Sequence, residues 1–419
     1  MTDVAREVEA VWRIEGARIV GALARTTGDL GLAEDVAQEA VAEALERWPS
    51  TGSPANPGAW LTAVAKRRAI DGWRRRERLD ARHRAIARDL EEVADDEWSP
   101  IPDDLLRLLF TACHPVLSRE SRVALTLRVV GGLSAEAVAR MLLVPVPTVQ
   151  ARTTRAKKAL AGLPFEPPDQ AEWPARLDSV LVVVSLMFTE GYAATSGDKW
   201  MRPELAGEAL RLGRVLASLA PGEPEVHGLL ALMELQASRF PARRASDGSP
   251  VLLEDQDRTR WDRAQIERGR AALARAAPLG PYALQAAIAE QHAIAPSAAR
   301  TDWRAIVRLY DRLLAIAPNA VVRLNRAVAV GMADGPEAGL RLVEELAAEG
   351  ALRGGHLVPA VRAELLSRAG RSSEAGAAFA EAAERAANER VRAALLARAA
   401  AGAVSARAPA PRRSSSAAC

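Results

Sequence analysis

The chain has few cysteines and no long apolar run, and each shortage excludes a class of protein. Of its 419 residues only 2 are cysteine, Cys113 within an apolar stretch and Cys419 at the last position. A disulfide framework is therefore excluded, and the pattern fits a reducing cytosol. The longest apolar run, 180–188, is too short to span a bilayer, and no signal-peptide pattern follows Met1. We therefore expect a soluble, cytoplasmic protein without a membrane partner.

The sequence also lacks the patterns that carry enzyme chemistry. No GxSxG or P-loop pattern occurs, and the 5 histidines are scattered along the chain. Cys113 and His114 are adjacent, but no further ligand lies at metal-binding spacing, so we expect them to be structural. The sequence therefore predicts no enzyme, no catalytic residue, no metal site and no cofactor.

Aromatic residues are scarce as well, and what replaces them indicates the fold class. The chain has only 3 Tyr and 5 Phe and is rich in Ala, Leu, Arg and Glu, which favours an all-α protein. Its length suits two or three domains with real cores. The net charge is only +3, so charge has to be considered locally.

Charge and proline divide the chain into blocks. The first, 5–88, is helical in pattern and becomes strongly basic from Lys66 onward. The next stretch, 89–104, carries eight acids and no base and is predicted to be a linker. A second helical block, 105–162, ends at the proline-rich stretch 163–174. Helical patterns then fill 175–400, and the last stretch, 405–419, is predicted to be a disordered tail.

The end of the second block, "LSAEAVARMLLVPVPTVQARTTRAKKAL" (133–160), has a two-part character. Ser134 is a plausible N-cap for a short helix with one apolar face. Pro145 ends that helix, and Pro147 suits the first position of the next one. The second helix is polar and basic on its outer side, so the pair predicts a helix-turn-helix. The alternative is an amphipathic hairpin with a solvated cationic face.

Three motifs follow one another at 28–48, 56–78 and 117–160. In this order they resemble the motifs of a bacterial sigma factor of the extracytoplasmic-function type. "GDLGLAEDVAQEAVAEALERW" (28–48) looks like the helix that binds core RNA polymerase. "NPGAWLTAVAKRRAIDGWRRRER" (56–78) looks like the −10 element helix. "LSRESRVALTLRVVGGLSAEAVARMLLVPVPTVQARTTRAKKAL" (117–160) looks like the −35 element helix-turn-helix. The resemblance implies region 2 over 5–88 and region 4 over 105–162, with bacterial core RNA polymerase and promoter DNA as partners.

The resemblance also assigns roles to individual side chains. Those expected to meet core polymerase share one helix face, because they lie at i, i+3 and i+4: Asp35, Gln38 and Glu39. Those expected at the −10 element are Asn56, Lys66, Arg67, Trp73, Arg74 and Arg75. Those expected at the −35 element are Thr148, Gln150, Arg152, Thr154, Arg155 and Lys158. For Trp60, core packing is favoured over a contact with DNA.

Two further interpretations concern the linker and the long extension. The acidic linker is either a solvated tether or, as in the family, a mimic of phosphates in the RNA exit path. The stretch 175–400 resembles the extension of the sigma subgroup with a tetratricopeptide-like domain, because helix pairs recur near 34 residues, and an irregular bundle is the alternative before about residue 300. We expect this extension to regulate activity, with Glu254 to Arg263 as its candidate contact and an anti-sigma or signalling protein as a possible partner.

Two other functions remain open at this point. One is a helix-turn-helix regulator whose helical domain senses a ligand or protein and which binds duplex DNA without polymerase. The other is a helical-repeat scaffold whose basic stretches are incidental. The second basic helix beside a Gly/Pro loop, at 49–78, favours a sigma factor, because a simple regulator has no use for it.

Overall fold

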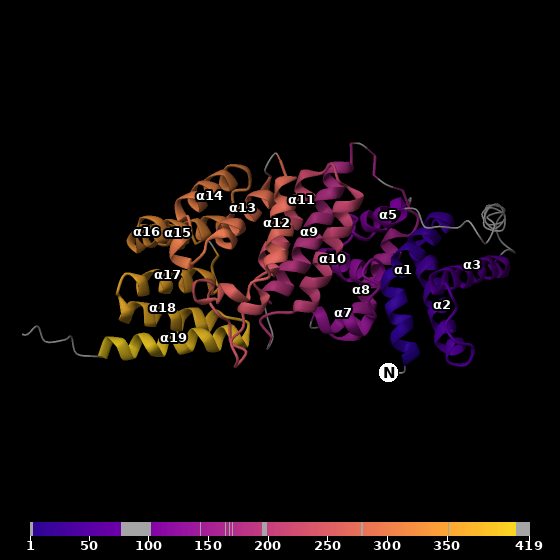
Figure 1. The fold of residues 1–419 in the computed structure, drawn as a ribbon, viewed down its shortest axis with the longest axis horizontal. Coiled ribbons are helices and arrows are strands. Elements are labelled where there is room, and N and C mark those ends of the chain that lie inside the picture. Colours follow the sequence, from indigo (N-terminus) through magenta and orange to yellow (C-terminus); the bar gives the residue numbers. More distant parts are fainter. Residues whose placement is uncertain are drawn as a thin grey trace, which may run out of the picture. The chain divides into compact units, whose positions relative to one another are not determined.

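The computed structural model describes residues 3–76 and 102–407, apart from 143, 164, 167, 170, 195–198, 278–279 and 351. Within these residues the regular elements are helices, and the one β pairing is an isolated bridge between Arg244 and Pro250 (Figure 1). The predicted all-α fold is confirmed. The chain divides into an N-terminal unit (1–188 and 211–219) and a C-terminal unit (189–210 and 220–419).

The N-terminal unit is a bundle of short and medium helices. They are α1 (Asp3–Thr27), α2 (Leu30–Thr51), α3 (Pro57–Arg76), α5 (Pro102–Ala112), α6 (Arg119–Val129), α7 (Ala135–Leu142), α8 (Val146–Leu160) and the larger part of α9 (Trp173–Tyr192). The end of α10 (Pro203–Leu219) also belongs to this unit. Helix α1 packs on α2, α3 and α5, while α8 packs on α6, α7 and α2.

Aliphatic side chains and one tryptophan pair form the core of the first three helices. Leu23 and Leu61 are fully buried, and so is Trp48 on α2. The ring of Trp60 meets the ring of Trp48 edge-on, with 5.5 Å between centroids. Such a pair adds roughly 1 kcal/mol to the stabilisation that burial itself provides. Trp60 is therefore engaged in packing, in line with the interpretation favoured from the sequence.

Two of the boundaries expected from the sequence differ in the structure. Helix α5 begins at Pro102, and Asp104, expected at the end of a solvated linker, is buried and paired with Arg25 at 3.0 Å. At the other end, the N-terminal unit continues past the proline-rich stretch 163–174. The Ser179 hydroxyl donates to the Cys113 carbonyl at 2.7 Å, so α9 is fastened to the helices before that stretch.

The C-terminal unit contains the remaining helices. They are the first part of α10, then α11 (Pro224–Ala237), α12 (Arg263–Ala274), α13 (Pro281–Ile294), α14 (Trp303–Ile316), α15 (Ala320–Asp334), α16 (Pro336–Ala348), α17 (Leu357–Arg368), α18 (Ser372–Arg385) and α19 (Glu389–Arg407). Three 3₁₀ turns, η1 (Phe240–Ala242), η2 (Leu253–Asp255) and η3 (Arg258–Arg260), lie between α11 and α12, and η4 (Ala298–Arg300) precedes α14.

From α13 onward each helix packs against the next one in the chain (Figure 1). Helix pairs begin at Trp303, Pro336 and Ser372, which agrees with the repeat spacing expected from the sequence. Small residues allow the close approach of α15 and α16, since a Cβ on Gly339 would lie 2.7 Å from the Ala327 carbonyl oxygen. A tetratricopeptide-like assignment stays a prediction.

His292 on α13 makes the stability of the C-terminal unit depend on pH. Burial, helped by the charges of Arg239 and Arg258, lowers the pKa of His292 to about 4. The unfolded state therefore binds the extra proton more readily, and stability falls as pH drops from about 6.5 to 4. Unfolding by urea should show roughly 3 kcal/mol less stability at pH 4 than at pH 7.5 from this group. In His292→Phe the free energy of unfolding should fall by roughly 3 kcal/mol less over this pH range. An equal fall in the variant and the wild type would contradict this assignment.

Candidate nucleic-acid interface

Helices α7 and α8 form the predicted helix-turn-helix, and local chemistry sets their ends. The Ser134 hydroxyl accepts from the Ala137 amide at 3.1 Å and caps α7. Helix α8 begins at Val146 with Pro145 as its N-cap residue, so Pro147 takes the second helical position rather than the first. Both prolines suit a helix start because neither has an amide hydrogen to satisfy there.

One side of α8 is buried and the opposite side carries the predicted DNA-contacting residues. Val149, Ala156 and Leu160 are buried, and so is Thr153, whose hydroxyl donates to the Val149 carbonyl at 3.0 Å. Of the six residues assigned to the −35 element, four are exposed and two are half-buried. The exposed ones are Gln150, Thr154, Arg155 and Lys158, and the half-buried ones are Thr148 and Arg152. The structure thus leaves a polar, basic helix face open to a ligand.

The residues assigned to the −10 element are placed less uniformly. Arg67 on α3 is exposed. Lys66, like its neighbour Ala65, is buried, which differs from the exposed position expected of a side chain that contacts a phosphate. Asn56 is exposed, but its side chain accepts from the Ala59 amide at 3.1 Å and caps α3. Trp73, Arg74 and Arg75 fall on the last turns of α3, and their side chains lie outside the described part of the structure.

The three residues assigned to core polymerase lie on α2, with Asp35 and Glu39 exposed and Gln38 half-buried. Glu39 is paired with Arg68 of α3 at 3.0 Å. Asp35 is 72% exposed, and its carboxylate lies 3.2 Å from the ammonium group of Lys157 on α8. The structure therefore brings a predicted polymerase-binding residue next to the predicted DNA-reading helix.

A buried carboxylate that sequence reasoning missed holds this contact together. Glu34 is 5% exposed and lies 3.1 Å from Arg128 of α6 and 2.9 Å from Lys157. Burial alone would lower the pKa of Lys157, but the carboxylates of Glu34 and Asp35 more than offset this and raise it. Leaving the buried carboxylate of Glu34 without a cationic partner would cost about 3–5 kcal/mol. No local pattern could have identified Glu34, because its partners lie far away in the sequence.

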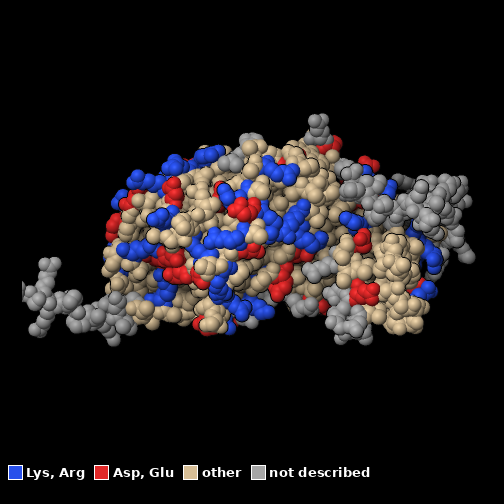
Figure 2. Space-filling model, viewed as in Figure 1, with Lys and Arg blue, Asp and Glu red and all other residues tan. Residues whose placement is uncertain are grey.

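The charged stretch Glu254 to Arg263 is engaged within its own unit. Glu254 pairs with Arg368, and the guanidinium of Arg258 donates to the carbonyl oxygen of Ala295 at 3.0 Å. Trp261 is buried. Other charged residues of the stretch, among them Asp255, Arg260 and Arg263, are exposed, and its role as a candidate contact stays a prediction. Figure 2 shows basic and acidic side chains interspersed over the visible face of this unit, without the single-sign stripe typical of nucleic-acid binding.

The remaining candidate for chemistry, Cys113, is a buried free cysteine. Burial raises the pKa of its thiol to about 11, so the reactive thiolate is scarce at neutral pH. Among the described residues no group of three or more His, Cys, Asp or Glu side chains is arranged to hold a metal ion. None of the described helices combines the length and apolar character that crossing a bilayer requires.

Three known families match successive stretches of the chain, and the first two matches follow the order of the motifs. Residues 13–79 match sigma-70 region 2, and residues 107–160 match sigma-70 region 4. Residues 176–277 match a family of unknown function, DUF6596. These matches support the part of the resemblance that concerns regions 2 and 4.

Two relatives cover different lengths of the chain. An uncharacterized protein of Rhizobium meliloti is 43% identical over 371 residues, which are 86% of this chain and 87% of the relative. The ECF RNA polymerase sigma factor SigL of Mycobacterium tuberculosis is 34% identical over 141 residues, which are 32% of this chain and 76% of SigL. No solved structure matches the chain.

Proposed function

We propose that the chain, which belongs to the sigma-70 family of RNA polymerase sigma factors, binds bacterial core polymerase and directs it to promoters with −10 and −35 elements. The observation that carries the proposal is the exposed polar and basic face of α8 within a region 4 domain that follows a region 2 domain. The work of such a protein is recognition and positioning, and it would take place in the cytoplasm.

Each assigned surface has a physical part in this function. Arg155 and Gln150 suit the major groove of the −35 element, where they would contact base edges, while Lys158 would neutralise a phosphate. Arg67 suits the phosphates of the −10 element. Asp35 and Glu39 present carboxylates that a basic surface of core polymerase would attract.

The ion pairs between α2 and α8 imply a change of state on binding. Elements about 25 base pairs apart are separated by roughly 85 Å at 3.4 Å per base pair. Lys157 and Asp35 lie 3.2 Å apart, so the region 2 and region 4 helices cannot reach both elements in this arrangement. About 25 residues join Arg76 to Pro102, a length that could bridge this span if extended. We therefore propose that core polymerase separates the two domains by competing for the α2 carboxylates.

The C-terminal unit is proposed to regulate this step, and a signalling or anti-sigma partner would act through it. Promoter recognition by such factors needs only regions 2 and 4, so a separate helical unit requires another purpose. Tests of this idea should use the full chain. A fragment ending near Gly162 would lose Trp173, whose ring packs on Phe110, and Ser179, whose hydroxyl donates to the Cys113 carbonyl. It would therefore lack contacts that stabilise region 4 in the full chain.

The dependence of DNA binding on polymerase tests the proposed function. Fluorescence anisotropy would be measured on a labelled promoter duplex with the protein alone, with core enzyme alone and with both. We expect a stable complex only with both components, because α8 and α2 hold each other until core enzyme separates them. Equally tight and sequence-specific binding by the protein alone would instead identify a simple helix-turn-helix regulator.

A further inference from the structure

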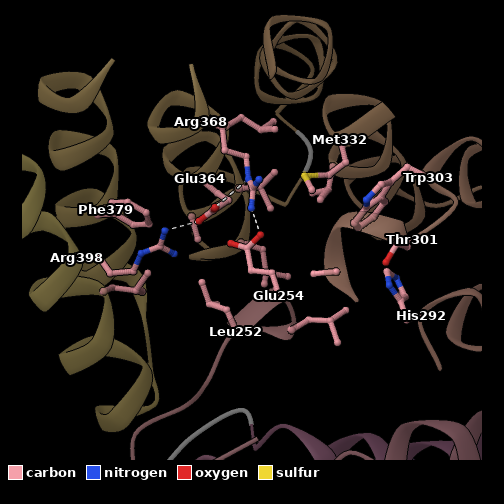
Figure 3. A pocket seen from close by; sticks show the side chains of 18 of the residues that line it. Leu252, Glu254, His292, Thr301, Trp303, Met332, Glu364, Arg368, Phe379 and Arg398 are labelled. Atoms are coloured by element: carbon pink, nitrogen blue, oxygen red, sulfur yellow. Dashed lines mark hydrogen bonds and ion pairs between the residues drawn. The ribbon is translucent and has the colours of Figure 1, made fainter. Parts of the chain in front are cut away.

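The C-terminal unit contains a cavity of about 710 Å³, lined by residues outside those matched to sigma-70 regions 2 and 4 (Figure 3). Its walls come from α13, α14, α15, α17, α18 and α19, together with η2, η3 and η4. A volume of this size is within the range of pockets that enclose small organic ligands. The cavity lies among helices of one unit, so no second copy or second unit is needed to form it.

Most of the cavity wall is apolar. Side chains on facing helices line it: Val328, Met332, Leu357, Val361, Leu365 and Leu395. When an apolar molecule displaces water from an apolar surface of this kind, the free energy of the system falls, so binding is favoured. The wall therefore favours a ligand with an apolar body.

One side of the cavity carries a network of opposite charges. Arg368 contacts both Glu254 and Glu364, and Glu364 is also paired with Arg398. The guanidinium carbon of Arg398 lies 4.2 Å from the centre of the Phe379 ring. With Arg258, three guanidinium groups and two carboxylates line the cavity, which leaves one positive charge in excess. Figure 3 shows Glu254 reaching Arg368 from η2, on a segment separate from α17. A ligand carboxylate could take the place of Glu254 at Arg368 and match the excess charge.

A different side of the cavity holds an unsatisfied polar group. Thr301 is 7% exposed and lines the cavity, and its hydroxyl has no hydrogen-bond partner among the described residues. The hydroxyl oxygen is closed off from the cavity in this rotamer, so a turn about the Cα–Cβ bond is needed to bring it to the cavity wall. A buried hydroxyl without a partner costs roughly 1–3 kcal/mol, so a ligand that bonds to the turned hydroxyl is favoured. The His292 ring also lines the cavity, in edge contact with Trp303, and Figure 3 shows it beside Thr301. These two groups are neutral, and they lie beside Arg258, whose guanidinium donates to the His292 carbonyl oxygen and supplies the excess positive charge.

We propose that this cavity binds an amphipathic carboxylic acid, with its carboxylate at Arg368 and Arg398, its apolar body along α15 and α17, and a polar group at Thr301. The burial of Thr301 without a partner distinguishes the site from an incidental gap between helices. Occupation would join α15, α17 and α19 to the segment at Thr301 and would release Glu254 of η2 from Arg368, which gives the C-terminal unit a chemical input.

Binding of dodecanoate to the full chain tests the proposal, with 1-dodecanol and 12-hydroxydodecanoate as companions. Calorimetric titration should show dodecanoate binding at least tenfold more tightly than the alcohol, because only the acid makes charge-assisted bonds. The hydroxy acid should bind more tightly than dodecanoate, and Thr301→Val should abolish that difference. Equal affinity for acid and alcohol, or no binding of the acid, would overturn the proposal.

A cavity-filling variant and a spectroscopic probe locate the binding. Ala360→Trp places a large ring in the cavity and should remove binding, whereas Ala347→Trp, on an exposed position of α16, should leave binding unchanged.

A methionine signal reports binding at this cavity directly. Of the 6 methionines, Met332 is the one that lines the cavity. In protein labelled with ¹³C-methyl methionine, dodecanoate should therefore shift the Met332 signal and leave the other five in place. The binding measurement itself uses the unsubstituted protein, and the conservative change Met332→Leu serves only to assign the signal. Binding that leaves Met332 unshifted would place the acid elsewhere and overturn the assignment.

Discussion

Replacing Arg155 and Lys158 together by alanine is expected to lower transcription from promoters that depend on a −35 element by roughly 10- to 100-fold. Both side chains are exposed on the open face of α8, while the opposite face is held in the core by Val149 and Leu160. A base contact contributes about 1–3 kcal/mol, and a lost phosphate contact weakens binding to all sequences. Neither substitution removes a packed side chain, so the fold should persist.

A matched substitution separates recognition from a general loss of positive charge. Arg304 on α14 is also exposed, but it belongs to the C-terminal unit. Arg304→Ala should transcribe like the wild type under the same conditions. Circular dichroism and thermal unfolding would verify that both variants are folded. Unchanged output from the double variant, with the fold intact, would remove α8 from the promoter interface.

Reversing the charge of Asp35 and Glu39 is expected to weaken binding to core polymerase by roughly 30-fold or more at low salt. A lysine at each position would set like charges against each other wherever α2 meets a basic surface, at a cost of several kcal/mol. Because these side chains are exposed, the loss should shrink as salt rises and screens the charges. Titration of labelled protein with core enzyme at two salt concentrations measures both effects.

Lys157→Gln is the control for the internal contact of α2. It removes the ion pairs of Lys157 with Asp35 and Glu34 but leaves the charge of the α2 face intact. This variant should bind core enzyme at least as tightly as the wild type, because the carboxylates no longer have an internal competitor on α8. Weak binding by Lys157→Gln together with normal binding by the double lysine variant would reverse the assignment of the two surfaces.

Local features of the chain predicted local structure well. The cap at Ser134, the prolines at 145 and 147 and the apolar spacing of α8 were sufficient to predict two helices and the side that is buried. Capping and periodicity act over a few residues, so they can be read directly from the sequence. The exposure of Asp35 and Glu39 followed from their spacing for the same reason.

Features that depend on distant partners could not be predicted in this way. Glu34 and Lys157 are far apart along the chain, and only the folded structure shows that a buried carboxylate joins them. Lys66 lies in a basic run, yet the packing of α3 buries it. The charged stretch 254–263 is largely exposed, as its sequence indicates, but Glu254 and Arg258 meet partners more than 30 residues away, on other elements of the unit. In each case the pattern indicates a charge and leaves its partner undetermined.

The most direct test of the account is transcription in vitro from a supercoiled library of genomic fragments, with and without the protein, at saturating core polymerase. The account predicts a set of RNA 5′ ends that forms only when protein and core enzyme are both present, each at a fixed short distance downstream of a shared pair of sequence elements. Arg155→Ala, Lys158→Ala should reduce the whole set, and Arg304→Ala should not. An identical set of 5′ ends with and without the protein, under conditions in which it binds core enzyme, would contradict the claim that it directs polymerase to promoters.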